Sequence, residues 1–143
     1  MIIPVSLYKD IQKVLPILCV DIVITAPRGR YLLLRRTNEP LQGEWYIVGG
    51  RMLQGESAES TARRKLKEEI GVSVDKLDFI GFYEDQFDRN SMESDILYHT
   101  VSLVFRCEIA ENEFIQLDKQ SSEWKWANTL PVRFRIKNCK VNV

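Results

Sequence analysis

The segment between Ser57 and Gly71 constrains the fold of this chain most, because it has the start, the periodicity and the end of a helix. Serine is a common residue at helix N-caps, and glycine is a common residue just past a helix end. Apolar residues between them recur every fourth position as one narrow stripe: Ala58, Ala62, Leu66 and Ile70. We therefore expect a helix over 57–70 that packs this stripe against a core.

Glu69 falls inside the apolar stripe, close to the angular position of Ala58. A carboxylate on a packed face is unfavourable unless a partner compensates its charge, and a divalent cation such as Mg²⁺ or Mn²⁺ is one such partner. In the other interpretation, ion pairs four residues apart steady an ordinary helix surface, Arg64 with Glu68 and Lys65 with Glu69. The helix pattern alone leaves both interpretations open.

A longer pattern around this helix resembles the Nudix box, with the spacing of that motif. Its matching positions are Gly50, Glu56, Arg64, Leu66, Glu68, Glu69, Gly71 and Val72. One position departs, because Lys65 stands where the family has a glutamate. The resemblance implies a metal-dependent Nudix hydrolase that acts on nucleoside diphosphates linked to another group. It also implies the Nudix fold, an α/β/α sandwich with a mixed β-sheet between helices, as one domain over residues 1–143.

Composition narrows the class of partner. The chain has 20 basic and 20 acidic residues, so no basic field favours nucleic acid or an anionic membrane. The apolar run over 17–26 is too short to span a bilayer, and the N-terminus lacks the regions of a signal peptide. The three cysteines form no metal-type pair, and Cys19 and Cys107 lie in apolar runs typical of reduced core residues. We expect a cytoplasmic protein.

The rest of the chain reads as strands separated by turns, preceded by a short helix. We expect a helix over 6–15, strands over 17–26, 30–36, 45–48, 77–87, 97–109 and 123–126, and a polar loop from 88 to about 95. The first two strands flank a Pro-Arg-Gly turn and are expected to form a hairpin. Residues 1–16 are expected to be an N-terminal helical extension, and 131–143 an irregular tail or edge strand.

Three polar positions within or beside strands have two interpretations each. Asp21 is either a strand residue facing water or a carboxylate at the floor of a substrate cleft. Arg36, at the end of its strand, belongs either to a solvated turn or to a group of guanidiniums that bind diphosphate oxygens. His99 is either a structural residue near a strand start or a contact to the substrate.

A narrower resemblance covers about residues 15–126 and points to the GDP-mannose mannosyl hydrolase branch of the Nudix family. It rests on Arg36, Thr37, Asn38, Pro40, Gly43, Trp45, Gly49, Gly50 and Arg51. By this resemblance Arg36 and Arg51 hold the diphosphate, and Asp21 contacts the substrate. Members of the branch also lack the glutamate that Lys65 replaces here.

The resemblance further implies one Mg²⁺, or Mn²⁺ in its place. The implied ligands are the Gly50 carbonyl, Glu69 and Gln120, with Glu68 or Glu56 near the ion. Lys65 removes a carboxylate and adds a cation beside Glu69, so we expect one catalytic metal where full-box relatives hold more. Ser121 stands where the branch has its general base, a histidine, and a serine hydroxyl is not basic near neutral pH.

Two reactions fit these residues: water attacks the anomeric carbon and releases a nucleoside diphosphate and a sugar, or it attacks phosphorus and splits the diphosphate. The expected catalytic residues are Arg64, Glu68, Glu69 and Glu123, and the base is open among Glu68, Glu123, His99, Asp85 and Asp88. A third possibility is a domain that binds a nucleotide sugar without hydrolysing it, which the retained carboxylates disfavour. The resemblance also leads us to expect a homodimer, with the N-terminal helix as a contact.

Overall fold

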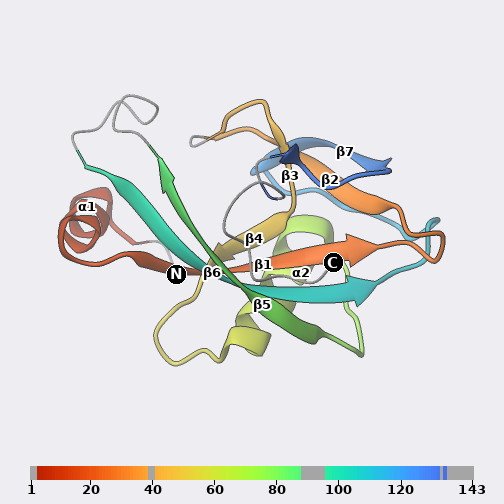
Figure 1. The fold of residues 1–143 in the computed structure, drawn as a ribbon, viewed down its shortest axis with the longest axis horizontal. Helices are drawn as coiled ribbons and strands as arrows, with labels where there is room; N and C mark the ends of the chain where they lie inside the picture. The colour runs from red at the N-terminus through yellow and green to blue at the C-terminus, as the bar shows by residue number, and fades with distance from the viewer. Residues whose placement is uncertain (1–2, 39–40, 88–95, 133, 135–143) are drawn as a thin grey trace.

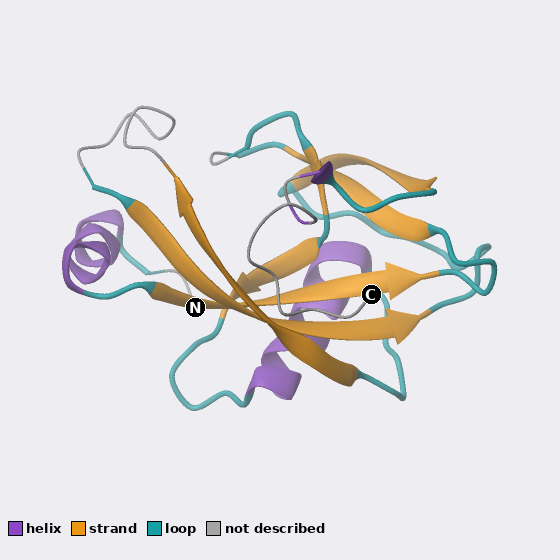
Figure 2. Ribbon diagram, in the orientation of Figure 1, coloured by secondary structure: helices purple, strands orange, loops and turns teal. Residues whose placement is uncertain are grey.

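A computed structural model describes residues 3–38, 41–87, 96–132 and 134. Their elements are α1 (Val5–Val14), β1 (Ile17–Thr25), β2 (Tyr31–Arg36), β3 (Trp45–Tyr46), β4 (Val48–Arg51), α2 (Ala58–Ile70), β5 (Asp78–Phe87), β6 (Tyr98–Glu108) and β7 (Ser121–Ala127) (Figures 1 and 2). The predicted loop over 88–95, with Asp88, lies outside the described residues. No helix in the described ranges is long and apolar enough to cross a membrane.

The strands form one mixed sheet in which β1 is central. The order is β3-β2-β1-β6-β5, with β4 also paired to β1 and β7 to β2. β1 and β6 run parallel, from Ile17 opposite Thr100 to Thr25 opposite Glu108, whereas β5 and β6 are antiparallel. Figure 1 shows β1 and β6 side by side across the middle of the molecule. The mixed sheet agrees with the predicted fold class.

The predicted hairpin between the first two strands is wrong over most of its length. In the described residues β1 and β2 share a single register pair, Thr25 with Tyr31. Beyond it β1 pairs with β4, and β2 pairs with β7. The predicted strand over 45–48 is likewise two short strands, β3 on β2 and β4 on β1. The turn brings the two strands together at one end only, because different partners occupy their edges beyond it.

The two faces of the sheet carry separate cores. On one face, Ala62, Leu66 and Ile70 of α2 pack with Val20 and Ile22 of β1. Since successive strand residues point to opposite faces, Val23 belongs instead to the second core, together with Tyr83, Val104, Leu130 and Phe134. α2 therefore covers one face of the sheet and the chain around Leu130 covers the other, as Figure 2 also shows for α2.

The start of the predicted C-terminal tail is part of the fold. Val132 and Phe134 are helical, and the Phe134 side chain is only 1% exposed. The prediction of an irregular tail or edge strand is therefore wrong at these residues, because a phenylalanine ring gains more from burial in the second core than from a solvated tail. By contrast α1 has no buried residue and lies at one end of the sheet (Figure 1).

Helix α2 forms where the sequence predicted it. The Ser57 hydroxyl accepts a hydrogen bond from the Ser60 amide at 3.0 Å and so caps the N-terminus. Gly71 ends the helix in the left-handed region at φ 71°, where its amide bonds to carbonyls of the last turn. Three residues of the predicted apolar stripe, Ala62, Leu66 and Ile70, are buried, Ala58 is partly buried, and Glu69 is buried with them.

Candidate active site

A cavity of about 460 Å³ opens on the face of the sheet opposite the apolar stripe of α2. Strands β1, β4, β5 and β6 contribute to its wall, together with α1 and one residue of α2. Its charged and hydroxyl-bearing lining includes Asp21, Asp85, Thr100, Ser102, Arg36 and Arg51. The two carboxylates and two hydroxyls are buried, whereas the two arginines are half-buried. The cavity thus has an acidic, hydroxyl-rich floor and a basic rim.

The floor contains a chain of hydrogen bonds that ends on Asp21. The Tyr83 hydroxyl donates to the Asp21 carboxylate, and the Tyr46 hydroxyl lies 2.6 Å from that of Tyr83. Burial raises the pKa of Asp21, while hydrogen bonds from Tyr83 and Ser102 act in the opposite direction. The structure therefore puts Asp21 in the cavity and not at a water-facing strand edge.

Two glycines of β4 leave room for side chains that pack against them. A Cβ on Gly49 would lie 1.9 Å from Asp21 Oδ1, and a Cβ on Gly50 would lie 2.6 Å from Lys65 Cε. Such contacts are far inside van der Waals distance, so any other residue would displace its neighbour. The glycine pair that the sequence placed before the Nudix helix is thus a condition for the positions of Asp21 and Lys65.

Arg51 joins the cavity to the N-terminal helix. Its guanidinium lies 4.5 Å from the centroid of the Tyr8 ring, a cation–π contact from α1. Tyr8 in turn hydrogen-bonds to Tyr98 of β6, and both tyrosines line the cavity. Arg36 lines the same cavity from the end of β2, so the two arginines predicted to hold a diphosphate face one space.

Glu69 lies behind β4, next to the cavity. It is 5% exposed, and its Oε2 accepts a hydrogen bond from the Gly49 amide at 3.0 Å. Burial is the main reason that the pKa of Glu69 is raised to about 7, although Lys65 opposes the shift. The inward direction predicted for this carboxylate is thereby confirmed.

Arg64 organises the other two acidic positions of the box. Its Nε and Nη2 donate to the Glu56 carboxylate at 2.7 and 2.9 Å, and its Nη1 lies 3.2 Å from Glu68 Oε2. Its Nη2 also donates to the Arg51 carbonyl at 2.9 Å, which ties α2 to β4. Hydrogen bonds from Arg64 lower the pKa of Glu56 to about 2. Arg64 is therefore a positioning residue that holds Glu56 and Glu68.

The donors present suit one magnesium ion. Among the described residues, no three Asp, Glu, His or Cys side chains converge into a metal-binding cluster. Mg²⁺ takes one or two carboxylates and fills its remaining positions with water and substrate phosphates. The buried Glu69 bonds to the Gly49 amide, and the next residue, Gly50, lines the cavity together with Gln120, so these three residues offer oxygen donors of the kind that Mg²⁺ takes. A cation there would also offset the cost of burying the Glu69 charge.

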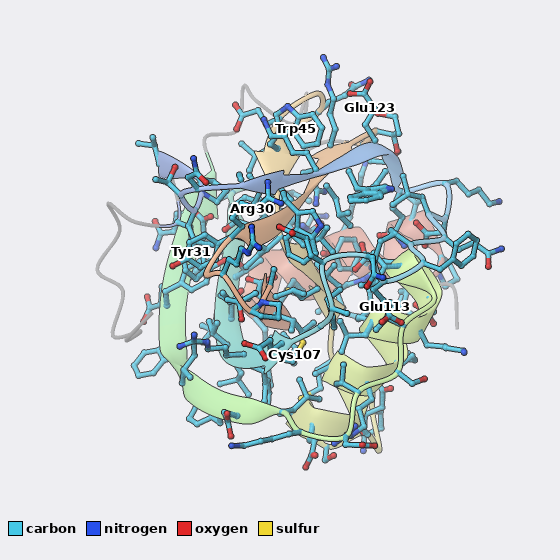
Figure 3. The ribbon with its side chains drawn as sticks, turned by 90° about the vertical axis from the view of Figure 1, so that its right-hand side faces the viewer. Arg30, Tyr31, Trp45, Cys107, Glu113 and Glu123 are labelled. Atoms are coloured by element: carbon cyan, nitrogen blue, oxygen red, sulfur yellow. The ribbon has the colours of Figure 1, made fainter. Side chains whose placement is uncertain are left out.

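Two predicted site residues lie away from the cavity. Glu123 pairs with Arg35 across β7 and β2, at 3.3 Å between Oε2 and Nη1, and is exposed. Figure 3 shows it at the same outer edge of the molecule as Trp45. His99 lies on β6 between Tyr98 and Thr100, which line the cavity, so strand alternation turns it away. Its Nε2 lies 3.7 Å from Glu84 Oε2. Neither Glu123 nor His99, both predicted as site residues, is therefore part of the lining of this cavity.

Sequence reasoning missed several residues of the floor. Tyr83, Tyr98, Thr100 and Ser102 all line the cavity, and none was singled out. A signal was present on β6, where Thr100 and Ser102 alternate with the apolar residues Val101 and Leu103. Such alternation on a central strand marks a polar face.

The two described cysteines are free and buried as predicted, and burial raises the pKa of each thiol to about 12.

The mixed sheet, the glycine-ended strand and the acidic helix behind it define the class of the protein as a Nudix hydrolase. Residues 15–133 match the NUDIX domain, and the chain belongs to this family. It is 30% identical to the low-salt glycan biosynthesis protein Agl8 of Haloferax volcanii over 123 residues, which cover 86% of this chain and 78% of that protein.

Two further similarities agree. The chain is 31% identical to an oxidized purine nucleoside triphosphate hydrolase of Danio rerio, over 77% of this chain and 67% of that protein. Its fold is similar to that of a MutT NUDIX hydrolase from Burkholderia pseudomallei, with a TM-score of 0.70 and 21% identity over 85% of this chain and 95% of that one.

Proposed function

We propose that the protein is a Mg²⁺-dependent hydrolase that acts on a GDP-mannose-like nucleoside diphosphate sugar and releases the sugar and the nucleoside diphosphate. One observation carries the proposal: a single cavity combines a basic rim with a buried floor of carboxylates and hydroxyls. Guanidiniums suit a diphosphate, and carboxylates and hydroxyls suit the hydroxyl groups of a sugar. The relative named for glycan biosynthesis supports a sugar nucleotide as the substrate.

In this reaction each cavity residue has a defined role. Arg36 and Arg51 bind the diphosphate oxygens, and Asp21, oriented by Tyr83, accepts a hydrogen bond from a substrate hydroxyl. Among the described candidate bases, Asp85 is the one that lines the cavity. We therefore assign it the role of general base, which accepts a proton from the attacking water. The water oxygen bonds to the anomeric carbon, and the bond from that carbon to the diphosphate oxygen breaks.

Glu69 and the Gly50 carbonyl would hold the ion, with Gln120 as a third donor and Arg64 keeping Glu68 and Glu56 in place. A bound Mg²⁺, or Mn²⁺, neutralises charge that develops on the departing nucleoside diphosphate. Because Lys65 adds a cation beside this position, we expect one metal per chain. Calorimetric titration with Mn²⁺ tests this number, and two tight sites would contradict it.

The test of the function is a substrate panel in Mg²⁺, led by GDP-mannose and GDP-glucose, with chromatographic identification of every product. We expect free sugar and GDP. We expect Glu69→Gln and Asp85→Asn to lower kcat at least about 100-fold, the range expected for loss of electrostatic stabilisation or of a general base. Full turnover by Glu69→Gln would overturn the assignment of the metal site.

The second candidate is a pyrophosphohydrolase that splits the diphosphate itself. It is supported by the surviving Glu68 and Glu69 and by the relative named as a nucleoside triphosphate hydrolase. Reaction in ¹⁸O-labelled water separates the two reactions. Label in the released sugar means attack at carbon, whereas label in a phosphate means attack at phosphorus and replaces our first proposal.

A non-catalytic nucleotide-sugar-binding domain is the third candidate. Saturable binding of GDP-mannose without product, across the panel and with either metal, would favour it.

We further propose a cytoplasmic homodimer. The exposed apolar residues Val5 and Val14 of α1 support a contact between copies, and sedimentation equilibrium tests it. Free, buried thiols support a reducing compartment, which cell fractionation tests.

A further inference from the structure

We propose that Lys65 is a diphosphate-binding residue: a fixed cation, carried by α2 into the cavity, that binds phosphate oxygens whether or not a metal is present. The inference rests on the proposed function in one respect, that the ligand carries a diphosphate. It assigns a role to the residue at which the chain departs from the Nudix box.

The position of Lys65 is built into the fold. The residue belongs to α2, its side chain lines the cavity together with residues of β4, and it is only 7% exposed. It packs against Gly50 of β4, where a Cβ would lie 2.9 Å from Cδ, 2.6 Å from Cε and 3.1 Å from Nζ. The absence of a side chain at Gly50 therefore leaves the space that Lys65 occupies beside the cavity.

A purely structural ion pair does not explain this position. Lys65 Nζ lies 3.3 Å from Glu68 Oε2, but Arg64 already pairs with that carboxylate at 3.2 Å. Glu68 is 46% exposed, so a lysine could reach it from the solvent side without burial. Burying an ammonium group is energetically unfavourable, so the ion pair with Glu68 alone does not account for a buried Lys65 beside the cavity.

The charges around the cavity complete the argument. Lys65 faces the same space as Arg36 and Arg51, so three cations from α2, β2 and β4 border it. An ammonium has three N–H donors, and the pair with Glu68 uses one of them. Within the described part of the chain the other two donors remain for an anion, and a diphosphate is the part of the proposed substrate that three cations fit.

The test measures binding without metal. Isothermal titration in excess EDTA follows GDP and inorganic pyrophosphate binding to the wild type, Lys65→Met and Lys65→Arg, with Lys67→Met as the matched control. Lys67 is on the same helix and exposed. We expect Lys65→Met to weaken both ligands about 10-fold or more, Lys65→Arg to restore part of the loss, and the control and guanosine binding to stay unchanged. Unchanged GDP and pyrophosphate binding by a folded Lys65→Met would overturn the proposal.

A second measurement, an NMR titration, is made on the wild-type protein itself. In protein labelled with ¹³C-lysine, with Lys65→Arg used only to assign the signal, pyrophosphate in EDTA should shift the Lys65 ε-carbon resonance and leave that of Lys67 in place. No shift at saturating pyrophosphate would overturn the proposal. Neither binding experiment depends on turnover. Failure to hydrolyse GDP-sugars in Mg²⁺ would therefore overturn the proposed function, whereas the two binding experiments alone decide the role of Lys65.

Discussion

At the scale of single residues, the adjacent glycines of β4 serve different neighbours. A Cβ on Gly49 would meet a carboxylate oxygen and also the backbone carbonyl of Val20 at 2.7 Å. A Cβ on Gly50 would meet only the flexible end of Lys65. The first clash involves atoms that cannot move away, and the second can be relieved by a change of rotamer.

We therefore predict that Gly49→Ala lowers the free energy of unfolding by about 1–3 kcal/mol, the usual cost of overpacking, and that Gly50→Ala costs less. Urea denaturation of both variants in EDTA measures the difference. Equal losses would show that the two sites do not differ as described.

The pair between Glu56 and Arg64 predicts a dependence of stability on pH. The pKa of Glu56 is lowered from 4.5 to about 2, so the folded state binds its proton less readily than the unfolded state. Stability from this group is present above pH 4.5 and is lost as the pH falls toward 2. Glu56→Gln should thus be less stable than the wild type at pH 7, and the two should converge near pH 2. Urea midpoints across this range, in EDTA, check the prediction; a constant difference would contradict it.

At the scale of elements, α2 is the piece that the sequence describes best, because its signals are local. The cap, the stripe and the closing glycine lie within one segment, and the structure confirms each. The strand bounds were also close, since alternation and turn residues are local signals. Strand partners were not predictable: no local pattern in 17–26 says that β1 pairs mainly with β4 and β6 and meets β2 only at Thr25.

The same limit applies to the site. The box spacing located Glu69 and Gly50, and the narrower resemblance led to Arg36, Arg51 and Asp21, which the structure brings to one cavity. Glu123 and His99 do not line this cavity, and the sequence could not show their direction, because a one-residue shift in register reverses the face of the sheet that a side chain occupies.

The cap of α2 gives a prediction at this scale. Ser57→Ala removes the acceptor for the Ser60 amide and should cost about 1 kcal/mol of stability. Ser57→Asp keeps an acceptor and adds charge favoured at a helix N-terminus, so it should retain wild-type stability. Thermal denaturation of the two variants checks the prediction, and equal melting temperatures would contradict it.

At the scale of the whole molecule, Phe134, which follows β7 in the chain, packs against the floor of the cavity. The Phe134 ring packs edge-on against Tyr83, with 5.2 Å between centroids, and Tyr83 donates to Asp21. Loss of the buried ring should therefore affect both stability and ligand binding.

We predict that Phe134→Ala costs about 3–5 kcal/mol of stability, as expected for truncation of a buried phenylalanine. Val132, which is 59% exposed, supplies the control: Val132→Ala should stay within about 0.5 kcal/mol of the wild type. Guanidinium denaturation measures both. A small effect at Phe134 would mean that this segment does not seal the second core.

The parallel pairing of β1 with β6 also bears on how the protein folds. Ile17 meets Thr100 about 80 positions later in the chain, so this contact closes a very long loop. Such a high contact order slows folding, and the central strand cannot complete its hydrogen bonds on a ribosome until β6 has emerged. During synthesis β1, which has apolar residues on both faces, is an unprotected template for association with other nascent chains.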